Sequence, residues 1–548
     1  MNIEAQLAHA WKLVQQGQIG AARDLCASVV RANPGHAPAV HLAGLIEKRL
    51  GNLDGAEERL RRSVVLSPGV AEFHVNLGNL LAERGAWDDA AREYAAAAAL
   101  EPAARPARRR LAEALARAGQ GVAAEREART LVAGDTGDTA ARVLLGDVLR
   151  MSQRHAEAEQ VYRDVLAATP GEGRAHHNLG ALLSQLHRPE EALTQLQAAT
   201  SAGITGAQLD HNLGQTLLQL GQLQAAQGAF AAALRRDPHN VDTLAMLARV
   251  RFLLGDADFT GHIHHAADQR PDLVHLRVLH GTLQWRAGNL SQAENALRTA
   301  LDRDPHNCAA HATLAYVLLD TGQVEHALAA SERAWSLEPT DNLACDARVS
   351  ALLSSGDAHS ALTIIEQCRR RWPLDQRWLA HLATASRLTD AVAYRELYDY
   401  SRFVRCYSLD APPGWASQHE FLAALADVLH SRHTGSIAPL DQSLRRGTQT
   451  TRSLLTDPAP VVQALLATLR EPLRDYCSRL SSTDHPFTQR NRGDVEFTGC
   501  WSVRLQGGGY HVNHVHPQGW ISSACYISIP AGVSAGSDHA GWIRFGEP

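Results

Sequence analysis

Three histidines lie within six residues near the end of this 548-residue chain, in the stretch YHVNHVHPQGW at residues 510–520. In a β-strand, side chains at i and i+2 point to the same face. We therefore expect His514 and His516 to share one face and His511 to point to the other. Two neighbouring imidazoles can occupy adjacent coordination positions of one metal ion. The sequence predicts His514 and His516 as metal ligands; the alternative is that the histidines pack in a strand without metal.

The residues around these histidines predict a small antiparallel β-structure. From Glu496 onward, four segments have strand-like composition or alternation, with GGGY as a turn: FTGCWSVRL, HVNHVHP, WISSACYISIP and GWIRF. Helical segments are expected near residues 420–430 and 461–480. The region therefore predicts an α+β module that differs from the chain before it.

Most of the preceding chain follows a 34-residue period. Prolines mark the ends of units on this grid, which shifts by one residue in the eighth unit: Pro34, Pro68, Pro102, Pro170, Pro238, Pro271, Pro305, Pro339 and Pro373. An alanine lies twelve residues before each grid point, except in the eighth unit, where Thr260 precedes Pro271 by eleven. A small residue lies twelve positions before each of the first seven alanines and before Thr260. We expect two closely packed helices per unit, with the proline ending the second helix.

This pattern resembles the tetratricopeptide repeat, with eleven units over roughly residues 5–375. The resemblance implies a mainly α-helical chain in which helix-turn-helix units stack into a right-handed superhelix with a concave inner surface. It also implies a protein or peptide as the binding partner.

Three asparagines recur in one slot of the first helix, in the NLG triplets that contain Asn76, Asn178 and Asn212. By the same resemblance, we expect them to line the concave face and to hold a peptide backbone through their amide donors and acceptors. The alternative is that asparagine is merely tolerated at an exposed helix position. The histidines of GHIHHAA at residues 261–267 lack a suitable ligand spacing, so we expect no metal there.

The repeat stops after Pro373, and three regions are predicted. Residues 1–375 form the repeat array, residues 376–410 contain capping helices and a linker, and residues 411–548 form the C-terminal module. The boundary near residue 411 rests on DAPPGW, because paired prolines followed by glycine interrupt a helix.

The C-terminal module resembles the 2-oxoglutarate/Fe(II) oxygenases that are fused to tetratricopeptide arrays in bacteria. The resemblance rests on GCWSVRLQGGGYHVNHVHPQGWISSACYISIP, with LRRGTQTTRSLL at residues 444–455 upstream. It implies a partial double-stranded β-helix (jelly roll), with Fe(II) and 2-oxoglutarate as cofactors. His514 takes the slot of the first histidine, and His516 takes a slot that holds Asp or Glu in many relatives.

In that family a distal histidine and a basic residue follow on later strands, whereas this sequence ends at GWIRFGEP. His539, in a predicted loop, is the one histidine downstream of the motif. We therefore expect an incomplete site with weak or absent turnover, reflecting a fragment, a frameshift or a lapsed enzyme.

Two functions compete. One is an oxygenase whose array presents a protein for hydroxylation, and the other is a non-catalytic scaffold with a vestigial oxygenase tail. A glycosyltransferase fused to repeats is disfavoured, because no second nucleotide-sugar-binding domain fits in the remaining residues. A net charge of −5 gives no electrostatic reason to expect nucleic acid or an anionic membrane. No apolar stretch is long enough for a membrane span, and the eight cysteines form no CxxC pair, so we expect a cytoplasmic protein.

Overall fold

The structure is a computed structural model that describes residues 2–433, 439–440, 442–480, 485–493, 495–530, 533 and 541–543. The chain divides into two compact units. The first comprises Met1–Leu186 and Glu191–Ile204, and the second comprises His187–Glu190 and Thr205–Pro548.

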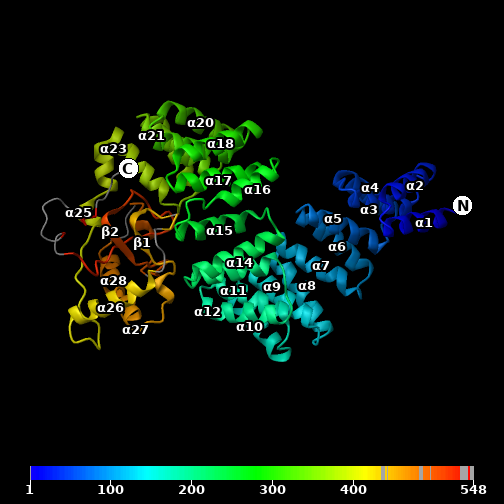
Figure 1. The fold of residues 1–548 in the computed structure, drawn as a ribbon, viewed down its shortest axis with the longest axis horizontal. Coiled ribbons are helices and arrows are strands. Elements are labelled where there is room, and N and C mark those ends of the chain that lie inside the picture. The colour runs from blue at the N-terminus through cyan, green and yellow to red at the C-terminus, as the bar shows by residue number, and fades with distance from the viewer. Residues whose placement is uncertain are drawn as a thin grey trace. The chain divides into compact units, whose positions relative to one another are not determined.

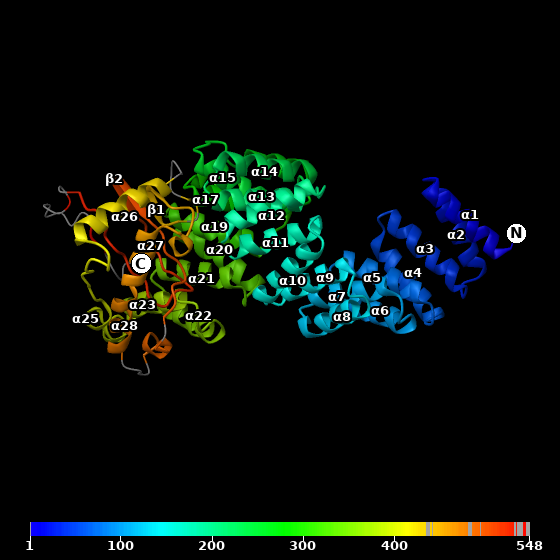
Figure 2. The ribbon, with the colours of Figure 1, turned by 90° about the horizontal axis from the view of Figure 1, so that it is seen from below.

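Eleven consecutive helix pairs cover the region predicted to repeat (Figures 1 and 2). In the first unit they are α1 Ile3–Gln15 and α2 Ile19–Ala32, α3 Ala37–Arg49 and α4 Leu53–Leu66, α5 Ala71–Glu83 and α6 Trp87–Leu100, α7 Arg105–Arg117 and α8 Gly121–Gly134, α9 Thr139–Met151 and α10 His155–Ala168, and α11 Gly173–Gln185 and α12 Pro189–Ser201, whose first two residues fall in the second unit. In the second unit they are α13 Ala207–Gln219 and α14 Leu223–Arg236, α15 Val241–Leu253 and α16 Gly261–Gln269, α17 Val274–Arg286 and α18 Leu290–Arg303, α19 Cys308–Asp320 and α20 Val324–Leu337, and α21 Asn342–Ser354 and α22 Ala358–Arg371. The predicted mainly α-helical fold of eleven repeat units is confirmed.

The turn inside each pair requires a left-handed backbone at one residue. Glycine supplies it in most units, as at Gly85 and Gly119, where φ is 77° and 76°. In the fifth and sixth repeat units, Gln153 and His187 occupy the same position, with φ of 60° and 57°. A side chain in this conformation costs roughly 1–2 kcal/mol, so these two turns are strained.

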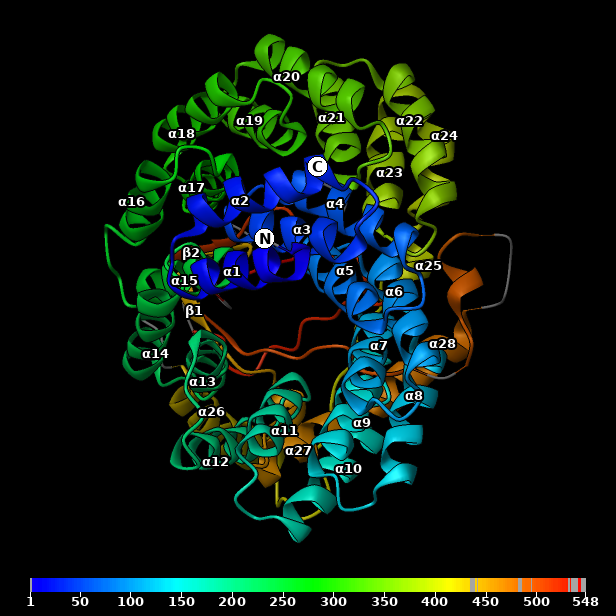
Figure 3. The ribbon, with the colours of Figure 1, turned by 90° about the vertical axis from the view of Figure 1, so that its right-hand side faces the viewer.

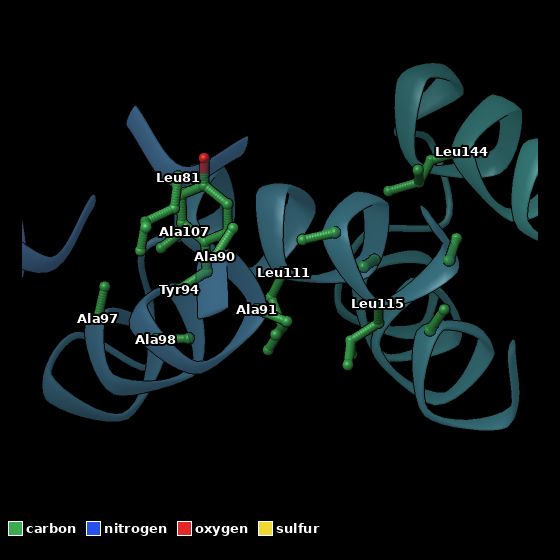
Figure 4. Close-up of a cluster of buried hydrophobic side chains, with 14 of the residues drawn as sticks. Leu81, Ala90, Ala91, Tyr94, Ala97, Ala98, Ala107, Leu111, Leu115 and Leu144 are labelled. Atoms are coloured by element: carbon green, nitrogen blue, oxygen red, sulfur yellow. The ribbon is translucent and has the colours of Figure 1, made fainter. Parts of the chain in front are cut away.

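The two small-residue positions let the helices of a pair pack closely. A Cβ atom added to Gly78 would lie 2.7 Å from the Tyr94 ring, and one added to Gly214 would lie 2.7 Å from the Phe230 ring. Tyr94 is 4% exposed and Phe230 is fully buried. Each glycine therefore makes room for a large side chain sixteen residues later. Figure 4 shows the core around Tyr94, Leu111 and Leu115, where alanines separate the larger side chains.

Several histidines of the array stabilise the unit boundaries. The Nε2 atoms of His74, His176 and His311 lie 2.9–3.1 Å from the carbonyl oxygens of the grid prolines six residues earlier, Pro68, Pro170 and Pro305. A proline has no backbone N–H, but its carbonyl still needs a donor. These imidazoles donate to the proline carbonyls, which gives part of the many histidines a structural role.

The eighth repeat unit is irregular, as predicted from Thr260, which replaces the alanine and lies eleven residues before the proline. Its second helix, α16, has nine residues, whereas the second helices of the neighbouring pairs, α14 and α18, have fourteen. Thr260 is buried directly before this helix, and its hydroxyl accepts a hydrogen bond from Gln284 Nε2 of α17 at 2.7 Å.

Helices continue beyond the array. They are α23 Arg377–Thr389, α24 Ala391–Leu397, α25 Tyr400–Phe403, α26 Gln418–Arg432, α27 Pro460–Thr468 and α28 Arg470–Arg479, with short 3-10 turns at Leu454–Thr456 and Thr488–Arg490. Figure 3 shows helices α17–α23 of the second unit following one another in a curved row. No helix in the described part of the chain is long and apolar enough to cross a membrane.

The sheet of the described residues has two antiparallel strands, β1 Leu444–Gln449 and β2 Val503–His511. The expectation of four strands from Glu496 onward is therefore wrong for residues 512–530, which form no strand. GGGY was expected as a turn but lies inside β2, opposite a β-bulge between Arg445 and Gly447. The jelly-roll interpretation and the domain boundaries at residues 375 and 410 stay predictions.

Candidate functional site

The loop that carries the histidines begins where β2 ends. His511 is the last strand residue and pairs with Leu444, and the next backbone N–H, that of Val512, donates to the Ser443 carbonyl oxygen at 2.9 Å. His514 and His516 follow in an irregular segment and are exposed. The structure thus places both predicted ligands in one loop at the end of the β1–β2 ribbon.

All three imidazole rings lie close together. The ring centroids of His514 and His516 are 5.2 Å apart, and those of His511 and His514 are 5.7 Å apart. The expectation that His511 points away from the pair is wrong. Alternation of faces holds only within a strand, and the strand ends at His511.

The hydrogen bonds of the loop select a tautomer for His514. Its Nδ1 atom lies 2.8 Å from the carbonyl oxygen of Val512, so Nδ1 carries the proton and donates. The lone pair then lies on Nε2, which is exposed with its side chain and available to a metal ion. Partial loss of solvent around its ring and the neighbouring His514 lower the pKa of the exposed His516, which favours the neutral imidazole that metal binding needs.

The metal ion that the resemblance implies for this loop is Fe(II). Neutral imidazoles are ordinary iron ligands, and His514 and His516 supply two of them side by side. Within the described residues, no group of three or more His, Cys, Asp or Glu side chains is arranged to hold a metal ion. His539 lies outside the described residues. The pair therefore fits Fe(II) in its chemistry.

The predicted peptide-binding asparagines contact groups of the protein itself. Asn76 Nδ2 lies 3.0 Å from His41 Nε2 in the preceding unit, and Asn178 Nδ2 donates to Asp147 Oδ1 at 2.6 Å. Asn212 is 8% exposed, and its Oδ1 accepts from Gln208 Nε2 at 3.1 Å. Their role in holding a peptide stays a prediction, but Asn76 and Asn178 also join neighbouring repeat units.

Sequence reasoning missed Asp147, the acceptor for Asn178. Burial raises the pKa of Asp147, while the Tyr162 hydroxyl, which donates to Oδ1 at 2.6 Å, and the charges of Arg150 and Arg174 act against that rise. Its slot on the 34-residue grid is that of Asn79, whose Oδ1 accepts from the Tyr94 hydroxyl at 2.8 Å. Comparing slots between units could have identified this recurring link between a tyrosine and an acceptor.

A second, partly buried carboxylate lies in the last repeat unit. Asp346 of α21 accepts from His381 Nε2 at 2.6 Å and from Arg377 Nη1 at 3.1 Å, both on α23. Burial alone would raise the pKa of Asp346, but the hydrogen bond with His381 and the charges of His381 and Arg377 lower it overall. The carboxylate therefore stays ionised and ties α23 to the end of the array.

Family models match both parts of the chain. Two models described as tetratricopeptide repeats match the array, one at residues 7–71, 41–107, 109–173 and 211–258 and the other at residues 284–347. A third, described as "Putative 2OG-Fe(II) oxygenase", matches residues 499–548, which contain both candidate metal ligands.

No curated protein sequence matches the chain. Among solved structures, it is similar to a tetratricopeptide repeat protein from Parabacteroides merdae, with 15% identity over 45% of this chain and 97% of that one and a TM-score of 0.41. It is also similar to yeast Tom70, with 12% identity over 72% of this chain and 96% of that one and a TM-score of 0.42.

The helix pairs observed in the structure and the family-model matches agree over most of the array. The chain therefore belongs to the tetratricopeptide repeat proteins, and its residues 499–548 match the oxygenase family at the C-terminus.

Proposed function

We propose that this protein is an Fe(II)- and 2-oxoglutarate-dependent oxygenase fused to a protein-binding tetratricopeptide scaffold. The array, residues 1–375, binds a protein or peptide and presents it to the module of residues 411–548 for hydroxylation, with residues 376–410 between them. The observation that carries the proposal is the adjacent His514 and His516 pair inside the stretch that the oxygenase model matches.

In this proposal, His514 binds the iron through Nε2, and His516 provides the second imidazole. Iron and 2-oxoglutarate, when bound, supply oxygen activation coupled to oxidative decarboxylation of 2-oxoglutarate to succinate. The hydrogen bond from His514 Nδ1 to the Val512 carbonyl keeps the ligand nitrogen free and fixes the plane of the ring. Because both ligands are neutral, the bound metal keeps more net positive charge than it would beside a carboxylate.

The partner is proposed to be an extended protein segment held in part by Asn76, Asn178 and Asn212. A side-chain amide both donates and accepts, which matches the groups of a peptide backbone. Because the amides of Asn76 and Asn178 also join repeat units, replacing all three asparagines by alanine should weaken both partner binding and the array. If the triple variant is as stable as the wild type and binds a captured partner with the same affinity, the asparagines do not hold the peptide.

A cytoplasmic location belongs to the same proposal, and cell fractionation checks it.

The decisive assay measures succinate. The purified chain is supplied with Fe(II), 2-oxoglutarate and oxygen, with and without a candidate partner, and succinate is quantified by mass spectrometry. A His514→Ala/His516→Ala variant should abolish any succinate above background, whereas His419→Ala, an exposed histidine on α26, should not. Equal succinate from all three proteins would assign the signal to contamination and reject the proposal.

A non-catalytic scaffold is the second candidate. It is favoured by the finding that, among the residues the structure describes, no three His, Cys, Asp or Glu side chains are arranged to hold a metal ion. It predicts partner binding that is identical in the wild type and the His514→Ala/His516→Ala variant, with no succinate from either protein.

A further inference from the structure

We infer that the end of the repeat array positions the histidine loop, residues 511–520, so that the last repeat units and the His514–His516 pair form one fixed assembly. The inference rests on the proposed function only for the role given to the two histidines. Three contacts within the second unit carry it.

The first contact joins the loop directly to the helix that follows the array. The backbone N–H of Gln376, the residue before α23, donates to the carbonyl oxygen of Pro517 at 2.8 Å. Pro517 is the residue after His516. A backbone bond between residues so far apart in sequence fixes the loop immediately beside a candidate ligand.

The second contact is an aromatic cluster made by Phe403, Tyr476, Phe487 and Trp520. Trp520 Nε1 donates to the Phe487 carbonyl oxygen at 2.8 Å, and the ring centroids of these two residues are 5.6 Å apart. The Phe403 ring lies 5.1 Å from that of Phe487, and the Tyr476 hydroxyl donates to the Phe403 carbonyl oxygen at 2.7 Å. Phe403, from the segment expected to contain a linker, is thus part of the packing of the C-terminal module.

Other bonds hold the same segment. His485 Nε2 lies 3.2 Å from the Leu397 carbonyl oxygen, and the Tyr407 hydroxyl donates to Asp475 Oδ2 at 2.8 Å. Residues 397–407 therefore contact the module at several points. A flexible linker would leave such groups in solvent, so this part of the segment fixes the orientation of the module on α23.

The third contact is made by Leu440, which packs into the core of the irregular eighth repeat unit. Leu440, which precedes β1, is 6% exposed and belongs to the hydrophobic cluster of that unit with Leu244, Phe259 and Ile263. The shortened α16 is thus the point at which a residue from outside the array joins the array's core. Burying such a leucine contributes about 1.5–3 kcal/mol, enough to stabilise the attachment.

Together these contacts hold the loop on both sides of the histidine pair. On one side, Val512 N–H bonds to the Ser443 carbonyl oxygen, and on the other, Pro517 and Trp520 are fixed. Ligands held before the metal arrives lose less conformational freedom on binding it. Arg377 and His381 also join α23 to Asp346 of α21, so the helix next to the loop contact is itself attached to the last repeat unit.

The test compares Trp520→Ala, Trp520→Phe and Phe403→Leu with Trp501→Phe. Trp501 lies in the same module, is 47% exposed and makes none of these contacts, so it is the matched control. Without metal, the amide hydrogen-exchange rate of residues 512–520 should rise at least tenfold in Trp520→Ala. It should rise by less in Trp520→Phe, which keeps an aromatic ring but loses the indole N–H donor. Exchange in α1–α10 should stay unchanged.

Calorimetric titration with Co(II) alone gives a second readout. We expect affinity to fall by about 10- to 100-fold in Trp520→Ala and to stay at the wild-type value in Trp501→Phe. Unchanged exchange of residues 512–520 in Trp520→Phe and Phe403→Leu would overturn the inference, even if Trp520→Ala fails to fold. Faster exchange in a protein whose wild type binds no Co(II) would support the positioning role and count against the proposed function.

Discussion

Replacing Gly214 by alanine tests the packing rule on which the whole array depends. Gly214 lies on α13, and the new Cβ atom would approach two ring carbons of Phe230 to 2.7 Å. Real Cβ contacts are not that short, so the ring or the two helices must move. Phe230 is fully buried in the hydrophobic core, which leaves its ring little room.

Gly228, on the second helix of the same pair, is the matched control. A Cβ atom there meets nothing within 4 Å. Glycine to alanine inside a helix gains about 1 kcal/mol from backbone entropy at both positions. Overpacking costs about 1–3 kcal/mol at Gly214 only. We therefore expect Gly228→Ala to stabilise the pair by about 1 kcal/mol and Gly214→Ala to be about 1–3 kcal/mol less stable than Gly228→Ala.

Native-state hydrogen exchange of the α13 and α14 amides is the suitable assay, because a long repeat array does not unfold as one two-state system. The difference between the two variants removes the helix-propensity term and leaves the packing term. Equal stabilisation by both substitutions would refute the reasoning, since it would show that the glycine slot has room for a side chain.

Three further predictions concern the first compact unit. Gln153→Gly should stabilise its repeat unit by about 0.5–1 kcal/mol, because it removes the strain of a left-handed glutamine, whereas Gly119→Gln in the preceding repeat unit should destabilise that unit; native-state hydrogen exchange of the helices on either side of each turn checks the pair. Asn178→Ala should cost about 1–3 kcal/mol even without a partner, because Asp147 loses a donor in a partly buried site; unchanged native-state hydrogen exchange of the α9 and α11 amides would contradict this. Burial lowers the pKa of His41 to about 4, so the unfolded chain binds a proton that the folded chain does not. The free energy of unfolding should fall by at most about 3 kcal/mol between pH 6.5 and 4, and a His41→Leu variant whose pH dependence equals that of the wild type would refute this assignment.

The array could be predicted because its information is local and repeated. Most repeat units supply their own turn glycine, small residues and proline, and the same pattern recurs from Ala10 to Pro373. Even the exception was visible, since the displaced Thr260 marks the unit whose second helix is short. What the pattern could not show is Leu440, because nothing near residue 440 indicates a contact with α15 and α16.

The C-terminal module was predicted less well because its structure depends on distant partners. GGGY reads as a turn, but β1 pairs with this segment and keeps it in β2. Strand β2 ends at His511, so strand alternation ceased to apply and the expected separation of His511 from His514 failed. Phe403 and Trp520 are far apart in sequence, and only the fold brings both onto Phe487.

An anaerobic titration with Fe(II) followed by 2-oxoglutarate tests the central claim most directly. The bound cofactors should give a weak visible charge-transfer band in the wild type that saturates at one iron per chain. The band should be absent from His514→Ala/His516→Ala and unchanged in the His419→Ala control. The absence of a band from the wild type, or its persistence without both histidines, would contradict the account.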